Sequence, residues 1–274
     1  MDDFSFFWPT GDVAVSTTIA RIIAAVVLAA LAGYTLQRAV LRYRKSAART
    51  DRMESQENFL VSGILVLLAL MLAFTTGFVV ERYDERRLLV VEEANAIGTA
   101  YLESQALGEP HRTRLSNLLI QYTDNRIALS TAARDRQPLL ANNDQLLTKI
   151  WAAVLASNDD ARERAVITPL FLAFTEVINY DTERKISRLT QVPQGILFTL
   201  YAFLTLTAVI LGAVLNGIRQ RIIAGILFLL LTLAVAMIVD LNRPTRGLIR
   251  ESQEALLLVR DSMKVPRADF DQYR

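Results

Sequence analysis

Residues 59–80 read FLVSGILVLLALMLAFTTGFVV, a run that contains no charged side chain. About 20 apolar residues in a helix match the ~30 Å hydrocarbon core of a bilayer. Uncharged runs of this length have few explanations in soluble proteins. The stretch therefore predicts a membrane-spanning helix, and the rest of the chain is interpreted outward from it.

Residues 195–218 and 222–239 have the same character and predict two further spans. The first apolar segment, 22–36, is shorter, but extending it back through 13–20 gives enough length and places Arg21 inside the span. Arg21 would then snorkel or face protein. The alternative is a signal peptide, which the small residues Ala29, Ala30 and Ala32 would suit. Because residues 1–12 carry aspartates and no Lys or Arg, we expect a retained span.

Apolar residues recur at three- and four-residue spacing throughout 81–191, so this stretch is expected to be helical. No proline interrupts 56–107, and the second span can therefore continue as a polar helix until the Gly108, Glu109, Pro110 turn. Arg219, Gln220 and Arg221 are expected to connect the last two spans, and a short helix is expected within 248–263.

The fold class that follows is an all-α membrane protein, with four transmembrane helices in two hairpins that flank an all-helical extramembrane module. We expect these segments: 1–58, the N-terminal segment with the first span and a basic loop; 59–80, the second span; 81–191, the extramembrane domain; 192–241, the second hairpin; and 242–274, a polar tail.

Composition excludes several classes of function. The 274 residues carry a net charge of +2, and the basic residues form no dense stripe, so nucleic acid is not an expected partner. The chain has no cysteine and a single histidine, His111, which removes thiol chemistry and multi-histidine metal sites. Neighbouring Glu92 and Glu93 diverge around a helix and do not form an acid/base pair. We expect no enzyme activity, cofactor or metal.

The charge pattern leaves the orientation open. Basic residues follow the first span and occupy the short loop near 220, which favours a cytoplasmic location for both loops. Basic residues also flank the other ends of the spans. The basic residues of the two loops are Arg38, Arg42, Arg44, Lys45, Arg49, Arg52, Arg219 and Arg221. Those at the other ends of the spans are Arg82, Arg86, Arg87, Arg184, Lys185, Arg188, Arg243, Arg246 and Arg250.

The segment 72–95 carries a family resemblance. It contains Leu72-Ala73-Phe74, Glu81-Arg82-Tyr83, Arg86-Arg87-Leu88 and then Asn95, and it resembles the bestrophin channels. The likeness is stronger to the bestrophin-like family of bacterial membrane proteins, whose R-Y-D-x-R-R and E-A-N-A-I-G-T-A-Y patterns stand within 82–101. The D-L-N-R-P pattern, with a following G-L-I, stands within 240–249. Asp84 takes the place of a second bestrophin aromatic, and no acidic run follows Pro244, so calcium gating is not implied.

The resemblance implies a homo-oligomeric channel, usually of five subunits, with the second span of each around a central pore. Leu70, Phe74 and Phe78 lie four residues apart and could form apolar rings that gate by dewetting; packing against other spans or lipid is the alternative. Thr75 and Thr76 are possible pore-adjacent hydroxyls or small residues at a helix interface. Glu81, Arg82 and Glu85 could set the charge of a vestibule or pair across helices.

The expected partners are therefore inorganic ions, membrane lipid and further copies of the chain. The expected location is the bacterial inner membrane, as a multi-pass protein. The resemblance favours a cytoplasmic module and termini. An ion channel is the first functional hypothesis, and a non-conducting membrane sensor or scaffold with a docking module is the alternative.

Overall fold

The computed structural model describes residues 15–43, 51–132, 136–158, 167–215, 217–243 and 247–264. Within these ranges all regular structure is helical and there is no β-strand. The chain divides into two compact units. The first, here called the membrane unit, comprises Met1–Arg82 and Val192–Ile249. The second, called the helical module, comprises Tyr83–Gln191 and Arg250–Arg274.

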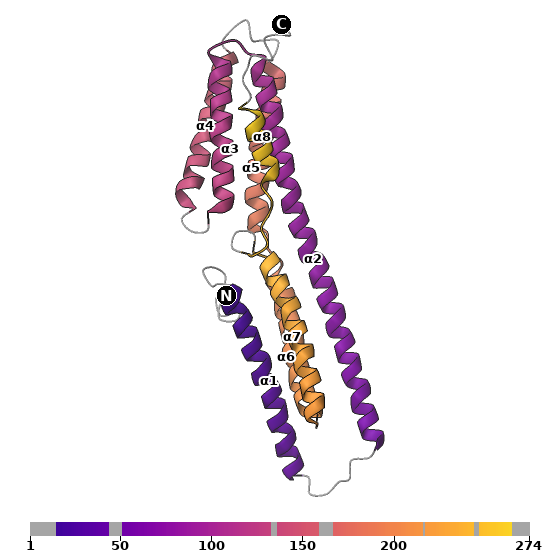
Figure 1. Cartoon of the computed structure of the whole chain (residues 1–274). Helices are drawn as coiled ribbons and strands as arrows, with labels where there is room; N and C mark the ends of the chain where they lie inside the picture. Colours follow the sequence, from indigo (N-terminus) through magenta and orange to yellow (C-terminus); the bar gives the residue numbers. More distant parts are fainter. Residues whose placement is uncertain are drawn as a thin grey trace. The chain divides into compact units, whose positions relative to one another are not determined.

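The expectation of an all-helical chain with four spans is confirmed. In the part of the chain that the structure describes, four helices are long and apolar enough to cross a membrane, judged by length and composition. The elements, labelled in Figure 1, are α1 (Val15–Tyr43), α2 (Asp51–Gln105), α3 (His111–Thr131), α4 (Gln137–Asn158), α5 (Ile167–Leu189), α6 (Gln194–Val214), α7 (Ile218–Leu241) and α8 (Glu254–Ser262).

Helix α2 is one unbroken element, as the absence of proline predicted (Figure 1). It ends at Gln105, just before the Gly108, Glu109, Pro110 turn. The part up to Arg82 belongs to the membrane unit, and the part from Tyr83 onward belongs to the helical module.

In the membrane unit, α1 packs most extensively against α6 and also contacts α7. Glycines permit the close approach of α1 and α6. A Cβ atom on Gly33 would overlap the carbonyl oxygen of Val209, and a Cβ atom on Gly212 would overlap that of Ala30. Small residues at such crossings let helix backbones touch, which is how spans gain packing energy without a hydrophobic driving force.

The turn between the last two spans differs from the expectation. Helix α6 ends at Val214 and α7 begins at Ile218, so Arg219 to Arg221 lie in the first turn of α7 instead of forming the loop. The backbone N–H of Gly217 donates to Oε1 of Gln220 at 3.4 Å, which satisfies one of the free donors at the start of the helix. Polar residues at the start of a helix resemble a loop in the sequence. For this reason the expected connection lay too far along the chain.

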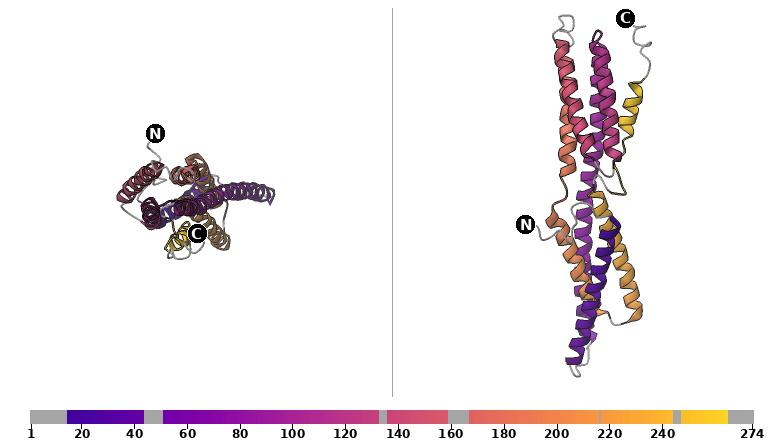
Figure 2. Two further views of the ribbon diagram at one scale, coloured as in Figure 1. Left: turned by 90° about the horizontal axis from the view of Figure 1, so that it is seen from above. Right: turned by 90° about the vertical axis from the view of Figure 1, so that its left-hand side faces the viewer.

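The helical module is built from α3, α4, α5, α8 and the later part of α2 (Figure 2). Its apolar core is contiguous and includes the fully buried side chains Ile97, Leu107, Leu115, Leu119, Tyr122, Ile150, Leu170 and Phe174. Helix α8 adds Leu256, and the Tyr101 hydroxyl donates to the Met263 carbonyl at 3.2 Å. The expected helix within 248–263 is shorter, because the backbone from 247 to 253 is not helical.

Candidate functional site

Helix α2 has two different faces in the membrane unit. Leu68, Thr75 and Val79 are buried within the chain. The side chains of Leu70 and Phe74 are 50% and 69% exposed. Since Leu70 and Phe74 are both large and apolar, this face is left for lipid, for a neighbouring subunit or for a pore lumen.

The other residues predicted on this stretch lie in less exposed positions. Phe78 is only partly exposed, and the guanidinium of Arg82 lies 5.3 Å from its ring centroid. The hydroxyls of Thr75 and Thr76 each donate to a carbonyl one turn earlier, at Met71 and Leu72, both at 2.7 Å. Leu70 and Phe74 are therefore the most outward-facing of the predicted gate residues.

The predicted vestibule charges stand just beyond this stretch on the same helix. Glu81 and Glu85 are exposed, whereas Arg82 is partly buried beside Phe78. Arg82 thus stacks on an aromatic ring, where a cation gains about 0.5–1 kcal/mol at an exposed site. Two carboxylates therefore lie at exposed positions of α2.

An exposed apolar stripe continues along α2 within the helical module. Leu88, Val91 and Leu102 are 56%, 42% and 59% exposed, and Asn95 between them is exposed too. The steps from 88 to 91, 95 and 102 are three, four and seven residues, which is the spacing of a coiled-coil seam. The spacing favours contact with another helix.

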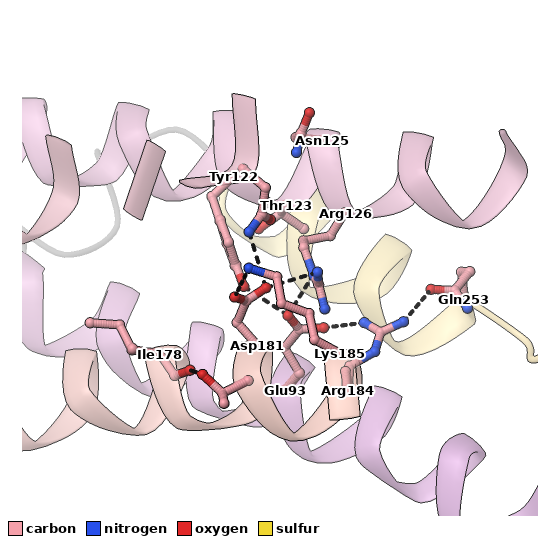
Figure 3. Close-up of polar contacts among 12 residues, drawn as sticks. Glu93, Tyr122, Thr123, Asn125, Arg126, Ile178, Asp181, Arg184, Lys185 and Gln253 are labelled. Atoms are coloured by element: carbon pink, nitrogen blue, oxygen red, sulfur yellow. Dashed lines mark hydrogen bonds and ion pairs between the residues drawn. The ribbon is translucent and has the colours of Figure 1, made fainter. Parts of the chain in front are cut away.

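The centre of the helical module holds a buried group of charges that no local pattern in the sequence indicates (Figure 3). Glu93 on α2 is fully buried and accepts a 2.8 Å hydrogen bond from the Tyr122 hydroxyl. Arg126 on α3 lies 2.7 Å from Oε1 of Glu93, and Arg184 on α5 pairs with Oε2. The one carboxylate therefore joins three helices.

A second carboxylate extends the cluster. Asp181 on α5 accepts hydrogen bonds from Arg126 at 2.9 Å and from Asn143 on α4 at 3.1 Å. Lys185 lies 2.8 Å from the other oxygen of Asp181 and 2.7 Å from Asp144. Buried charges are tolerated only when paired and hydrogen-bonded, and here each buried carboxylate meets two cations.

The cluster also fixes the protonation state of Tyr122. Burial above all, and then the neighbouring Glu93 carboxylate, raise the pKa of the Tyr122 phenol well above its usual value. The phenol therefore stays neutral and acts as a donor. Among the described residues no group of three or more His, Cys, Asp or Glu could hold a metal ion. The arrangement ties the helices of the module together.

The motifs that carried the family resemblance have structural roles at the ends of the spans. Arg86 pairs with Glu251 at 3.1 Å, and both side chains are buried. The two carboxylate oxygens of Asp240 accept from the backbone N–H groups of Leu248 and Ile249 at 2.7 and 2.9 Å. Asn242 accepts from the N–H of Val192 at 3.0 Å, so the start of the third span is tied to the end of the fourth.

The comparisons with known proteins agree with this architecture. A family model described as a Bestrophin-like domain matches residues 23–256. No curated protein and no solved structure matches the chain. The family is one of channels and not of enzymes, and the four apolar helices suit an integral membrane protein. The chain belongs to the bestrophin-like family, which indicates a membrane protein of the ion-channel type.

Proposed function

We propose that copies of this chain assemble around α2 into an ion channel of the inner membrane, in which Leu70, Phe74 and Phe78 form an apolar gate. The supporting observation is the exposure of Leu70 and Phe74, which lie on a different face of α2 from the buried residues Leu68, Thr75 and Val79. A narrow ring of large apolar side chains gives a hydrated ion no replacement for its water and so forms a barrier.

The stripe in the helical module favours a neighbouring subunit over lipid as the cover for α2. Leu102 lies far beyond residue 80, where the apolar run ends, since each helical residue adds about 1.5 Å. Lipid tails do not cover a side chain at that distance. A second copy of α2 would bury Leu88, Val91 and Leu102, and Asn95 would specify the register, as a polar residue in a coiled-coil seam does.

In such a ring, Glu81 and Glu85 place carboxylates close to the pore axis. Rings of acidic side chains concentrate cations at a channel mouth. Thr75 and Thr76 are assigned to helix packing, because both hydroxyls already bond to carbonyls of their own helix. The number of subunits in this assembly is taken as five from the resemblance alone.

The test has two parts. The purified chain is reconstituted in a planar bilayer, and reversal potentials are measured in asymmetric salt. In parallel, Val91→Cys is oxidised in membranes, because a chain without cysteine forms no other disulfide. We expect current and a covalent dimer band from Val91→Cys, and none from Leu172→Cys, an equally apolar exposed position on α5.

The non-conducting sensor is the alternative that this test excludes or supports. No current from a stable, correctly inserted protein, together with a dimer by native mass spectrometry, would favour the sensor. Equal crosslinking at positions 91 and 172 would show random collision and would remove the α2 assembly.

A further inference from the structure

The membrane unit contains an apolar groove of about 580 Å³ bounded by α1, α6 and α7. Its volume lies in the range of about 300–1,000 Å³ that is typical of small-molecule sites. The walls are aliphatic and aromatic, and include Ile23, Val27, Leu31, Leu211, Phe228 and Leu229. Several of these side chains are exposed in the single chain, so the groove is open along its length.

The groove exists because α7 carries small residues where it faces this space. Ala224 and Gly225 line it. A Cβ atom added to Gly225 would meet nothing within 4 Å. Gly225 therefore faces open space, in contrast to Gly33 and Gly212, whose hydrogens touch a neighbouring backbone.

One end of the groove is aromatic and basic. Tyr34 and Arg221 line this end. The guanidinium carbons of Arg38 and Arg221 lie 4.6 and 4.5 Å from the centroid of the Tyr34 ring. Stacking uses the flat face of a guanidinium, so its N–H groups point outward from the edge. The Nε–H of Arg221 donates to the Leu215 carbonyl at 3.4 Å, which leaves a phosphate to be met by the terminal NH₂ groups.

The segments that line this end contribute no acidic side chain. The chain has no Asp or Glu between residues 13 and 50 or between 184 and 239. Arg221 also stands in the first turn of α7, where the helix dipole is positive. Tyr and Arg at the end of a span are the side chains found at headgroup level in a bilayer.

We propose that this groove binds an anionic phospholipid, with one acyl chain along α1 and α7 and the phosphate held by Arg38 and Arg221. An acyl chain matches the apolar walls, and the two guanidiniums complement the charge of the headgroup. A helix from a second copy would fill the apolar part but would leave the basic end uncompensated. The site rests on the membrane location of the chain and is independent of ion conduction.

The test uses the full chain, purified and delipidated in detergent. Phosphatidylglycerol and phosphatidylcholine are titrated separately, and binding is followed by native mass spectrometry and by the thermal unfolding midpoint. Inorganic phosphate forms a third arm. We expect phosphatidylglycerol to bind and stabilise more strongly than phosphatidylcholine, and inorganic phosphate to have no effect.

Two variants and two controls locate the site. Arg221→Gln removes a charged hydrogen-bond donor and should weaken phosphatidylglycerol binding about tenfold or more. Gly225→Leu should abolish binding by filling the groove. Arg219→Gln changes the charge equally in the same turn but does not line the groove, and Gly195→Leu adds the same side chain in open space on α6. Both controls should bind like the unmodified chain.

Each contrary result would overturn the proposal. Equal binding of the two lipids, or equal losses in Arg219→Gln and Arg221→Gln, would indicate general surface attraction. Stabilisation by inorganic phosphate would indicate an anion site without a lipid. Loss of the oligomer in Gly225→Leu, with unchanged lipid binding, would assign the groove to a second copy. Helix content by circular dichroism verifies that each variant is folded, and Arg38→Gln replaces Arg221→Gln if that variant is not.

Discussion

The hydroxyl of Tyr122 on α3 donates a 2.8 Å hydrogen bond to the Glu93 carboxylate on α2, and both side chains are fully buried. Arg126 and Arg184 approach the same carboxylate from two different helices. The Glu93 carboxylate is thus the point through which α2, α3 and α5 are connected in the helical module.

Replacing Glu93 should be costly. Glu93→Gln leaves two buried guanidiniums without a full counter-charge, and breaking a buried ion pair costs about 3–5 kcal/mol. Thermal or chemical unfolding of the purified chain, followed by circular dichroism, measures the loss. Glu92→Gln removes the same charge from the adjacent, partly exposed position and should change the free energy of unfolding by less than about 1 kcal/mol. Equal losses would show that the cluster does not hold the module together.

The raised pKa of Tyr122 predicts how the stability of the chain changes at alkaline pH. The pKa of Tyr122 is raised in the folded chain, first by burial and then by Glu93. Above about pH 10 the unfolded chain releases this proton while the folded chain keeps it. The unfolded state then binds fewer protons, so stability falls by about 1.4 kcal/mol per pH unit for this group.

Comparing how stability changes with pH in the unmodified chain and in Tyr122→Phe isolates the contribution of the Tyr122 phenol. Tyr122→Phe loses the hydrogen bond but has no proton to release, so its stability should fall less steeply between about pH 10 and the folded pKa. Below pH 10 the two slopes should coincide. A Tyr122→Phe variant with the same alkaline slope as the unmodified chain would refute the assigned cause.

Much of the fold could be predicted from the sequence, because its signals are local. The apolar run 59–80 and the absence of proline from 56 to 107 were sufficient for α2. The groups that join distant parts of the chain could not be found in this way. Arg126 and Asp181 are 55 residues apart, and Glu93 and Arg184 are 91 apart. Glu92 and Glu93 look alike in the sequence, and only their positions around α2 distinguish the buried one.

The same limit applies to the contact between α1 and α6. Gly33 and Gly212 are ordinary small residues in apolar runs, and the need for glycine appears only when Val209 and Ala30 are brought against them. Gly212→Leu should separate the two helices. Overpacking usually costs about 1–3 kcal/mol, and because a backbone carbonyl cannot move aside we expect the upper end.

The measurement for this contact is the thermal midpoint in detergent together with recovery of monodisperse protein. Gly195→Leu is the matched control, since a Cβ atom there meets nothing within 4 Å. If Gly212→Leu is as stable as Gly195→Leu, the close approach of α1 and α6 is wrong.

The four spans predict a labelling pattern with single cysteines. Lys45 lies outside the described residues but within the first connection, Ser130 lies in the helical module, and Gln220 lies at the start of α7. An impermeant thiol reagent should label Lys45→Cys and Gln220→Cys from one side of the membrane and Ser130→Cys from the other. Labelling of positions 45 and 220 from opposite sides would mean a different number of spans.

The gate on α2 is tested most directly by the current through Phe74→Ala, compared with the unmodified chain in the same planar bilayer. Phe198→Ala, a similarly exposed aromatic on α6, is the control. We expect higher conductance from Phe74→Ala with the oligomer intact, and unchanged conductance from Phe198→Ala. Phe74→Ala should also cost far less stability than the roughly 3–5 kcal/mol of a Phe→Ala change in a core, because the Phe74 side chain faces the lumen. Unchanged current from Phe74→Ala together with a collapsed oligomer would make Phe74 a packing residue and would contradict the proposed gate.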